Sequence, residues 1–136
     1  MLDRRGFVSG AISATIALAS AQARADAQKS PKIPLKFLKK IEYPGDDYVC
    51  VLVEVDLDPE ERVPRHMHPG VESSYLAAGS VTLSVEGQPD LIVKTGDGYQ
   101  IPPETPHSVR NGPLKSTIVS TLIVEKAKPL LSLVPE

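Results

Sequence analysis

The sequence predicts an all-β domain, a sandwich or a barrel, and a jelly roll satisfies its pattern. Short runs rich in β-branched residues recur along the chain, and turn-forming residues separate them at intervals of about 8 to 12 residues. No segment sustains the periodicity of a helix. With 136 residues, the chain suits one domain and is too short for two ordinary ones.

The composition indicates which residue types form the core and which classes of partner are not supported. Hydrophobic residues make up 41% of the chain, but only 4% are aromatic and Trp is absent, so Val, Ile and Leu must supply most of the core. The net charge of -2 does not support nucleic acid or an anionic membrane surface as a partner. The single cysteine, Cys50, rules out an internal disulfide, and its place in an apolar run indicates a buried core thiol.

Residues 1–25 have the features of an export signal. Arg4 and Arg5, with Phe7 two positions on, resemble a twin-arginine signal; a mildly apolar, uncharged stretch follows, and an Ala-x-Ala cleavage pattern ends at Ala25. A transmembrane anchor is the alternative, but the apolar run is shorter than the roughly 20 residues that a span needs. We therefore expect cleavage, a periplasmic location and no stable membrane anchor in the mature protein.

Residues 26–34 follow as a polar, flexible leader, and residues 35–136 form the predicted β-domain. Its first strand, Leu35–Tyr43, ends at a Pro-Gly-Asp-Asp turn. Tyr48–Leu57 is the strongest strand signal, because it is dense in β-branched residues and alternates toward its end. After a charged loop, Val63–His68 is the next strand.

Glycine and proline divide the second half of the domain. We expect Glu72–Ala78 and Ser80–Glu86 to pair as a hairpin around Gly79. Further turns and a proline-rich segment delimit the last predicted strands, which are Leu91–Thr95, Tyr99–Pro102, His107–Arg110 and Ser116–Glu125. The tail contains an apolar Leu130-Leu131 pair, which we expect to pack across the barrel or onto a partner.

The three histidines and one glutamate indicate a metal site. His66 and His68 are separated by one residue, so both imidazoles lie on one face of a strand. Glu72 follows across a tight Pro-Gly turn, and His107 comes from a later strand. Neutral imidazoles and a carboxylate suit a divalent transition metal, and four protein ligands leave positions open for water or substrate.

These residues fall into two motifs that resemble those of the cupin superfamily. The first cupin motif is G-x5-H-x-H-x3–4-E-x6-G, and the residues at its positions here are Glu60, His66, His68, Glu72 and Gly79. The second is G-x5-P-x-G-x2-H-x3-N, and the residues at its positions here are Gly96, Pro102, Glu104, His107 and Asn111. Two glutamates thus replace motif glycines, while every ligand position keeps its residue type.

The resemblance implies a small single-domain cupin, a double-stranded β-helix (jelly-roll) barrel with His66, His68, Glu72 and His107 as metal ligands. It also implies a homodimer, because the terminal segments of such barrels often build dimers. The donor set admits Fe, Mn, Ni, Co, Cu or Zn. Twin-arginine substrates cross the membrane already folded, so metal acquired in the cytoplasm favours Fe, Mn or Ni.

The alternation of side chains along a strand predicts which other residues near the site face the interior. Counting from Glu72 points Ser74 and Leu76 inward, and counting from His107 points Val109 inward. Either Tyr99 or Gln100 faces the cavity. A further set shares the face of the last strand that is expected to line the barrel, namely Thr117, Val119 and Thr121.

Glu104 is a candidate proton acceptor near the mouth of the barrel, although an exposed turn residue is the preferred interpretation. The sequence shows neither a dedicated acid–base pair nor an Arg or Lys that clearly points inward. The leading hypothesis is a metal-dependent enzyme of oxygenase, isomerase or lyase type that acts on an oxygenated small molecule. The alternative is a non-catalytic periplasmic module that binds a metal or a small ligand.

Overall fold

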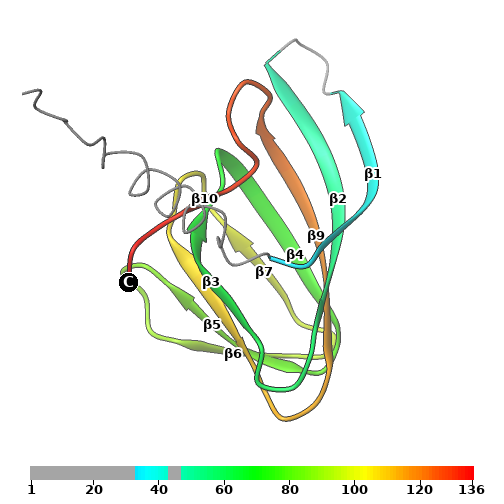
Figure 1. Cartoon of the computed structure of the whole chain (residues 1–136), viewed down its shortest axis with the longest axis vertical. Helices are drawn as coiled ribbons and strands as arrows, with labels where there is room; N and C mark the ends of the chain where they lie inside the picture. The colour runs from blue at the N-terminus through cyan, green and yellow to red at the C-terminus, as the bar shows by residue number, and fades with distance from the viewer. Residues whose placement is uncertain (1–32, 43–46) are drawn as a thin grey trace, which may run out of the picture. The chain divides into compact units, whose positions relative to one another are not determined.

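The computed structural model of the chain describes residues 33–42 and 47–136 (Figure 1). These residues form ten β-strands and no helix, so none of them belongs to a helix that crosses a membrane. The strands are β1 Leu35–Glu42, β2 Tyr48–Leu57, β3 Arg62–Met67, β4 Gly70–Ala78, β5 Ser80–Val85, β6 Leu91–Lys94, β7 Gly98–Ile101, β8 His107–Asn111, β9 Ser116–Glu125 and β10 Ser132–Leu133.

The predicted export signal over residues 1–25 and the leader up to residue 32 lie outside the described residues. The cleavage, the periplasmic location and the homodimer therefore stay predictions.

The strands form two antiparallel five-stranded sheets. The order of the first is β1-β2-β9-β4-β7, and the order of the second is β10-β3-β8-β5-β6. Neighbours in each sheet are mostly distant in sequence, so the chain passes repeatedly from one sheet to the other. The arrangement confirms the predicted all-β, double-stranded β-helix fold, with β2 and β9 at the predicted bounds.

One predicted pairing is wrong, because β4 and β5 do not form a hairpin. β4 pairs with β7 and β9, whereas β5 pairs with β6 and β8 in the other sheet. Gly79 is the corner between the sheets and has a φ of 91°. A Cβ atom there would collide with the Ser116 side chain and lie 2.7 Å from the Lys115 carbonyl oxygen. Glycine is needed here for a change of sheet rather than for a two-residue turn.

The core consists of alternate residues on the inner faces of both sheets. In β2 the buried positions are Val49, Val51, Val53, Val55 and Leu57, and in β9 they are Ser116, Ile118, Ser120, Leu122 and Val124. The inward positions predicted for Thr117, Val119 and Thr121 are therefore wrong, since these side chains lie half-buried on the outer face. Cys50 likewise lies half-buried on the outer face, opposite Ile123, because its neighbours Val49 and Val51 occupy the core.

Asn111 is the last residue of β8, and its side chain connects segments that follow β2 and β8. Its side chain is buried and donates from Nδ2 to three backbone carbonyls, those of Leu57, Asp58 and Leu114, at 3.2, 2.7 and 2.9 Å. Its Oδ1 accepts hydrogen bonds from the Gly112 N–H and the Ser116 hydroxyl. The last residue of the second motif therefore serves the backbone and not the metal site.

Both glutamates that replace motif glycines adopt the left-handed backbone conformation. The φ of Glu60 is 63° and that of Glu104 is 53°. The described residues contain no other non-glycine position with positive φ. A side chain with a Cβ is strained in this region, and glycine adopts it freely. The fold thus keeps the turns that the motif glycines would allow, at a cost in conformational energy.

Replacing Glu60 by glycine is expected to stabilise the protein. The side chain is exposed, and relief of the left-handed strain exceeds the entropy that glycine adds to the unfolded chain, so Glu60→Gly should raise the free energy of unfolding by about 0.5–1 kcal/mol. Urea denaturation measures this change. Glu60→Ala is the control, because it keeps the Cβ atom and should bring no such gain; equal stability of the two variants would contradict the argument.

Candidate metal centre

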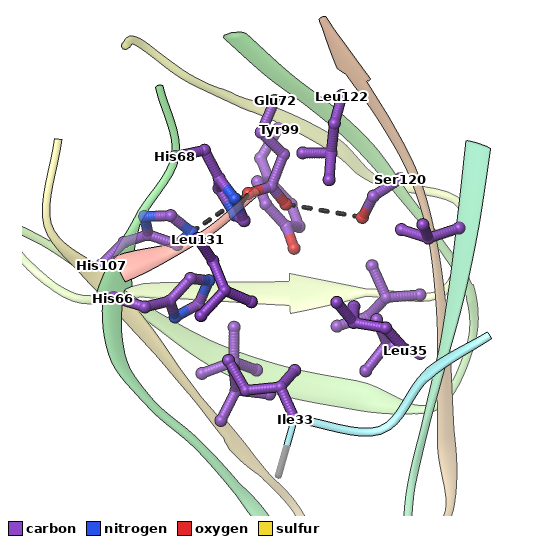
Figure 2. Close-up of a pocket in the computed structure, with 15 residues that line it drawn as sticks. Ile33, Leu35, His66, His68, Glu72, Tyr99, His107, Ser120, Leu122 and Leu131 are labelled. Carbon is purple, nitrogen blue, oxygen red and sulfur yellow. Dashed lines mark hydrogen bonds and ion pairs between the residues drawn. The ribbon is translucent and has the colours of Figure 1, made fainter. Parts of the chain in front are cut away.

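Four buried side chains meet in the interior, and they are His66, His68, Glu72 and His107. One potential ligand atom from each lies within 4.8 Å of all the others. Figure 2 shows the three imidazoles on one side of the cavity with the Glu72 carboxylate beside them. The structure therefore gathers the complete set of ligands that the sequence predicts.

Both sheets contribute to this cluster. His66 of β3 lies in register with His107 of β8, so two imidazoles come from neighbouring strands of one sheet. His68 follows the end of β3, and its backbone carbonyl accepts a 2.8 Å hydrogen bond from the Glu104 N–H. Glu72 projects from β4 in the opposite sheet. The site is thus a bridge between the two layers of the barrel.

Each histidine uses its Nδ1 for a hydrogen bond to a backbone carbonyl. His66 contacts the Pro64 oxygen at 2.7 Å, and His107 contacts the Thr105 oxygen at 2.9 Å. His68 reaches the Leu130 oxygen at 2.8 Å. A carbonyl oxygen can only accept, so the hydrogen must be on Nδ1 in all three rings. In its neutral form each ring then has no hydrogen on Nε2, so that this atom can coordinate a metal.

The carboxylate of Glu72 is fixed from the opposite side. The Ser74 hydroxyl donates to Glu72 Oε1 at 2.6 Å, and the Ser120 hydroxyl lies 2.6 Å from that of Ser74. Because the Ser74 hydroxyl donates its hydrogen to the carboxylate, the Ser120 hydroxyl donates to the Ser74 oxygen. The other oxygen, Oε2, faces the Nε2 atoms of His107 and His68 at 3.0 and 3.3 Å. One carboxylate oxygen is therefore held by the protein, and the other faces the histidines.

The electrostatics of the cluster favour neutral His66 and ionised Glu72. Burial and the neighbouring His107 lower the pKa of His66 to about 4. Burial alone would raise the pKa of Glu72, but the close His107 and His68 rings and the hydrogen bond from Ser74 outweigh it and hold that pKa well below its usual range. At neutral pH the cluster therefore offers a neutral imidazole and a carboxylate anion.

This donor set fits a cation at its centre. Because Nδ1 carries the hydrogen in the neutral rings, the Nε2 lone pairs of His68 and His107 would face the Glu72 oxygen at only 3.3 and 3.0 Å. Such an arrangement is favourable only with a positive charge between these atoms. A divalent metal ion would supply that charge and would be bound by three nitrogens and one oxygen.

The ligands line a small and mostly apolar cavity of about 30 Å³. Tyr99 and Ser120 are its other polar residues, and burial, with the nearby Glu72 charge, raises the pKa of Tyr99. The open choice between Tyr99 and Gln100 is thereby resolved, since Gln100 is exposed. Ser74 and Val109 point inward as the sequence predicts.

Glu104 does not join the cluster. Its side chain is exposed and forms an ion pair with Lys128 at 3.2 Å, and it is not among the residues that line the cavity. This position favours the exposed turn residue over the proton acceptor.

Sequence reasoning missed three contributors to the site. Ser120 lies on the inner face of β9 with Ile118 and Leu122, whereas the residues expected from the sequence to face inward are the alternate ones. The Leu130-Leu131 pair of the tail packs against the barrel, as one of its two predicted alternatives has it, but the roles of the Leu130 carbonyl and the Leu131 side chain in the site were not predicted. No local signal in the sequence connects these tail residues to His68.

Comparison with known families and structures agrees with this geometry. Residues 53–119 match the family described as "Cupin domain". No curated protein matches the sequence.

Solved structures with a similar fold include two enzymes much longer than this chain. The DMSP lyase DddQ from Ruegeria pomeroyi DSS-3 has a TM-score of 0.54 and 21% identity, over 65% of this chain and 44% of that one. An oxalate oxidase in complex with the substrate analogue glycolate has a TM-score of 0.56 and 22% identity, over 63% and 46%. The chain thus spans less than half the length of either enzyme.

A third similar structure is the polyketide cyclase RemF from Streptomyces resistomycificus, with a TM-score of 0.55 and 23% identity over 68% of this chain and 63% of that one. Identities this low show a shared fold and leave the chemistry of this chain open. The segment over residues 53–119 thus resembles the cupin domain family, and the strand order and the cluster of three histidines and a glutamate agree with that resemblance.

Proposed function

We propose that this protein binds one divalent transition metal through His66, His68, Glu72 and His107, and that the metal serves an enzyme acting on an oxygenated small molecule. The observation that supports it most directly is the set of three Nδ1–H hydrogen bonds to backbone carbonyls, which leave the three Nε2 atoms available as ligands. Four protein ligands leave two positions of an octahedral ion free. Fe, Mn or Ni are the proposed metals if export follows the predicted twin-arginine route; the donor set also admits Zn, Cu or Co.

The roles of the protein residues follow from their contacts. A bound metal would supply Lewis-acid activation of a substrate oxygen. The carbonyls of Pro64, Thr105 and Leu130 hold the three rings in place, and the hydroxyl of Ser74 orients Glu72. The surrounding aliphatic side chains limit access of bulk water.

Metal content tests the centre directly. The purified wild-type protein is expected to contain about one equivalent of transition metal by elemental mass spectrometry, and His107→Ala should lose most of it, because one of four ligands is absent. The matched control is Gln100→Ala, an exposed position outside the cavity. Circular dichroism verifies folding of each variant. Metal retained at the wild-type level in folded His107→Ala would contradict the assigned ligand set.

Orientation of Glu72 by Ser74 is tested separately. Ser74→Ala removes the 2.6 Å hydrogen bond to Oε1 and should weaken metal affinity by about tenfold, as is typical when a partner of a ligand is lost. Competition with a chromophoric chelator measures the affinity. Ser73→Ala is the control, because the neighbouring hydroxyl faces outward and is exposed. Equal affinity of both variants would mean that Ser74 does not position the carboxylate.

Turnover distinguishes the enzyme from the alternative, a non-catalytic module that binds a metal or a small ligand. The metal-loaded protein is incubated with diols, diketones and phenolics, while oxygen consumption and product formation are followed. We expect metal-dependent turnover that His107→Ala abolishes. Binding without turnover across this panel, by protein of full metal content, would favour the non-catalytic module, for which the small apolar interior is equally suited.

A further inference from the structure

The cavity around the proposed metal is lined mainly by aliphatic side chains. Apart from the four ligand residues, Tyr99 and Ser120, all its lining side chains are valine, leucine or isoleucine. Among the described residues, no lysine or arginine lines it. Figure 2 shows aliphatic side chains such as Leu35 and Leu122 across the cavity from the histidines. A ligand bound here would meet charge only at the metal.

The charge of the centre limits the charge of its ligand. Three neutral imidazoles and the Glu72 carboxylate would leave a divalent ion with one net positive charge. A chelating group with one negative charge neutralises that remainder. A second negative charge would be buried among aliphatic side chains with no cation to pair with, which is strongly unfavourable.

The cavity is small, and one residue, Leu131, is placed to limit the size of a bound ligand. A space of about 30 Å³ is enough for one or two water molecules and too small for an organic ligand. Leu131 lines it from the tail rather than from the inner face of a sheet, and Figure 2 shows its side chain beside the imidazoles. Rotation of this half-buried side chain would enlarge the cavity while the Leu130 carbonyl keeps its hydrogen bond to His68.

We infer that the site takes an oxygen chelator with an apolar body and at most one negative charge, and that Leu131 sets the size of that body. This inference rests on the proposed metal centre. It adds a ligand class that the fold alone does not define, because the class follows from the lining of this particular cavity.

Two 2-oxo acids with the same chelating head and bodies of similar size test the ligand class. They are 4-methyl-2-oxopentanoate, whose body is an aliphatic branch, and 2-oxoglutarate, whose body ends in a second carboxylate. Each is titrated into the wild-type protein loaded with cobalt(II), and the visible spectrum reports binding at the metal. The apolar acid is expected to bind at least about tenfold more tightly at neutral pH.

The possible outcomes separate the inference from the proposed function. Equal or tighter binding of 2-oxoglutarate would overturn the inference and leave the metal centre standing. A cobalt spectrum that neither acid changes would likewise overturn the inference and leave the metal centre standing. Failure of the folded protein to bind cobalt would overturn the metal centre and the inference with it.

Leu131→Ala tests the size limit. It should raise the affinity for phenylpyruvate, a bulkier 2-oxo acid, by about tenfold relative to that for 4-methyl-2-oxopentanoate, because the removed side chain leaves room for the ring. Leu133→Ala is the matched control, since it shortens an exposed leucine of the same tail that does not line the cavity. An unchanged ratio in Leu131→Ala, or an equal change in Leu133→Ala, would overturn the role of Leu131.

Discussion

The candidate site depends on hydrogen bonds between imidazole Nδ1 atoms and backbone carbonyls. Two of them are local, because His66 and His107 each use the carbonyl two residues upstream. The third is not, because the carbonyl that holds His68 belongs to Leu130, 62 residues away. Two ligands are therefore oriented by their own segments, while the third requires the tail to dock along β3. Completion of the metal centre is in this way coupled to completion of the fold.

A polar cluster in the interior must compensate for the apolar packing that it displaces. The residues of the cluster lie where the two hydrophobic clusters approach each other, one containing Val55 and Ile118, the other Val53 and Leu122. Buried polar groups are tolerated when each has a partner. Here carbonyls satisfy the Nδ1 hydrogens, and Ser74 with Ser120 satisfies one oxygen of Glu72. The remaining atoms, three Nε2 and Oε2, have a common requirement for a cation.

The sequence allowed the ligands and most strands to be predicted because both signals are local. Period-two counting worked from Glu72 to Ser74, where a functional residue anchors the parity, and failed in β9, which lacks one. The hairpin around Gly79 was wrong because a glycine signals a turn but not whether the next strand pairs with the last or joins another sheet. The packing of Leu130 and Leu131 across the barrel was one of two predicted alternatives, but the hydrogen bond from His68 to the Leu130 carbonyl was beyond sequence reasoning, since docking of the tail is a long-range contact.

The two departures from the cupin motifs affect positions that determine backbone conformation and leave the metal-ligand positions unchanged. Glu60 and Glu104 stand at motif glycine positions and have positive φ, a conformation that glycine adopts freely and that strains a residue with a Cβ atom. The strain at Glu104 lies close to the site, because its N–H donates to the carbonyl of His68. That hydrogen bond and the ion pair with Lys128 help to hold the strained turn in place. Backbone geometry can therefore be reached by more than one residue type, whereas the donor set uses all three histidines of the sequence.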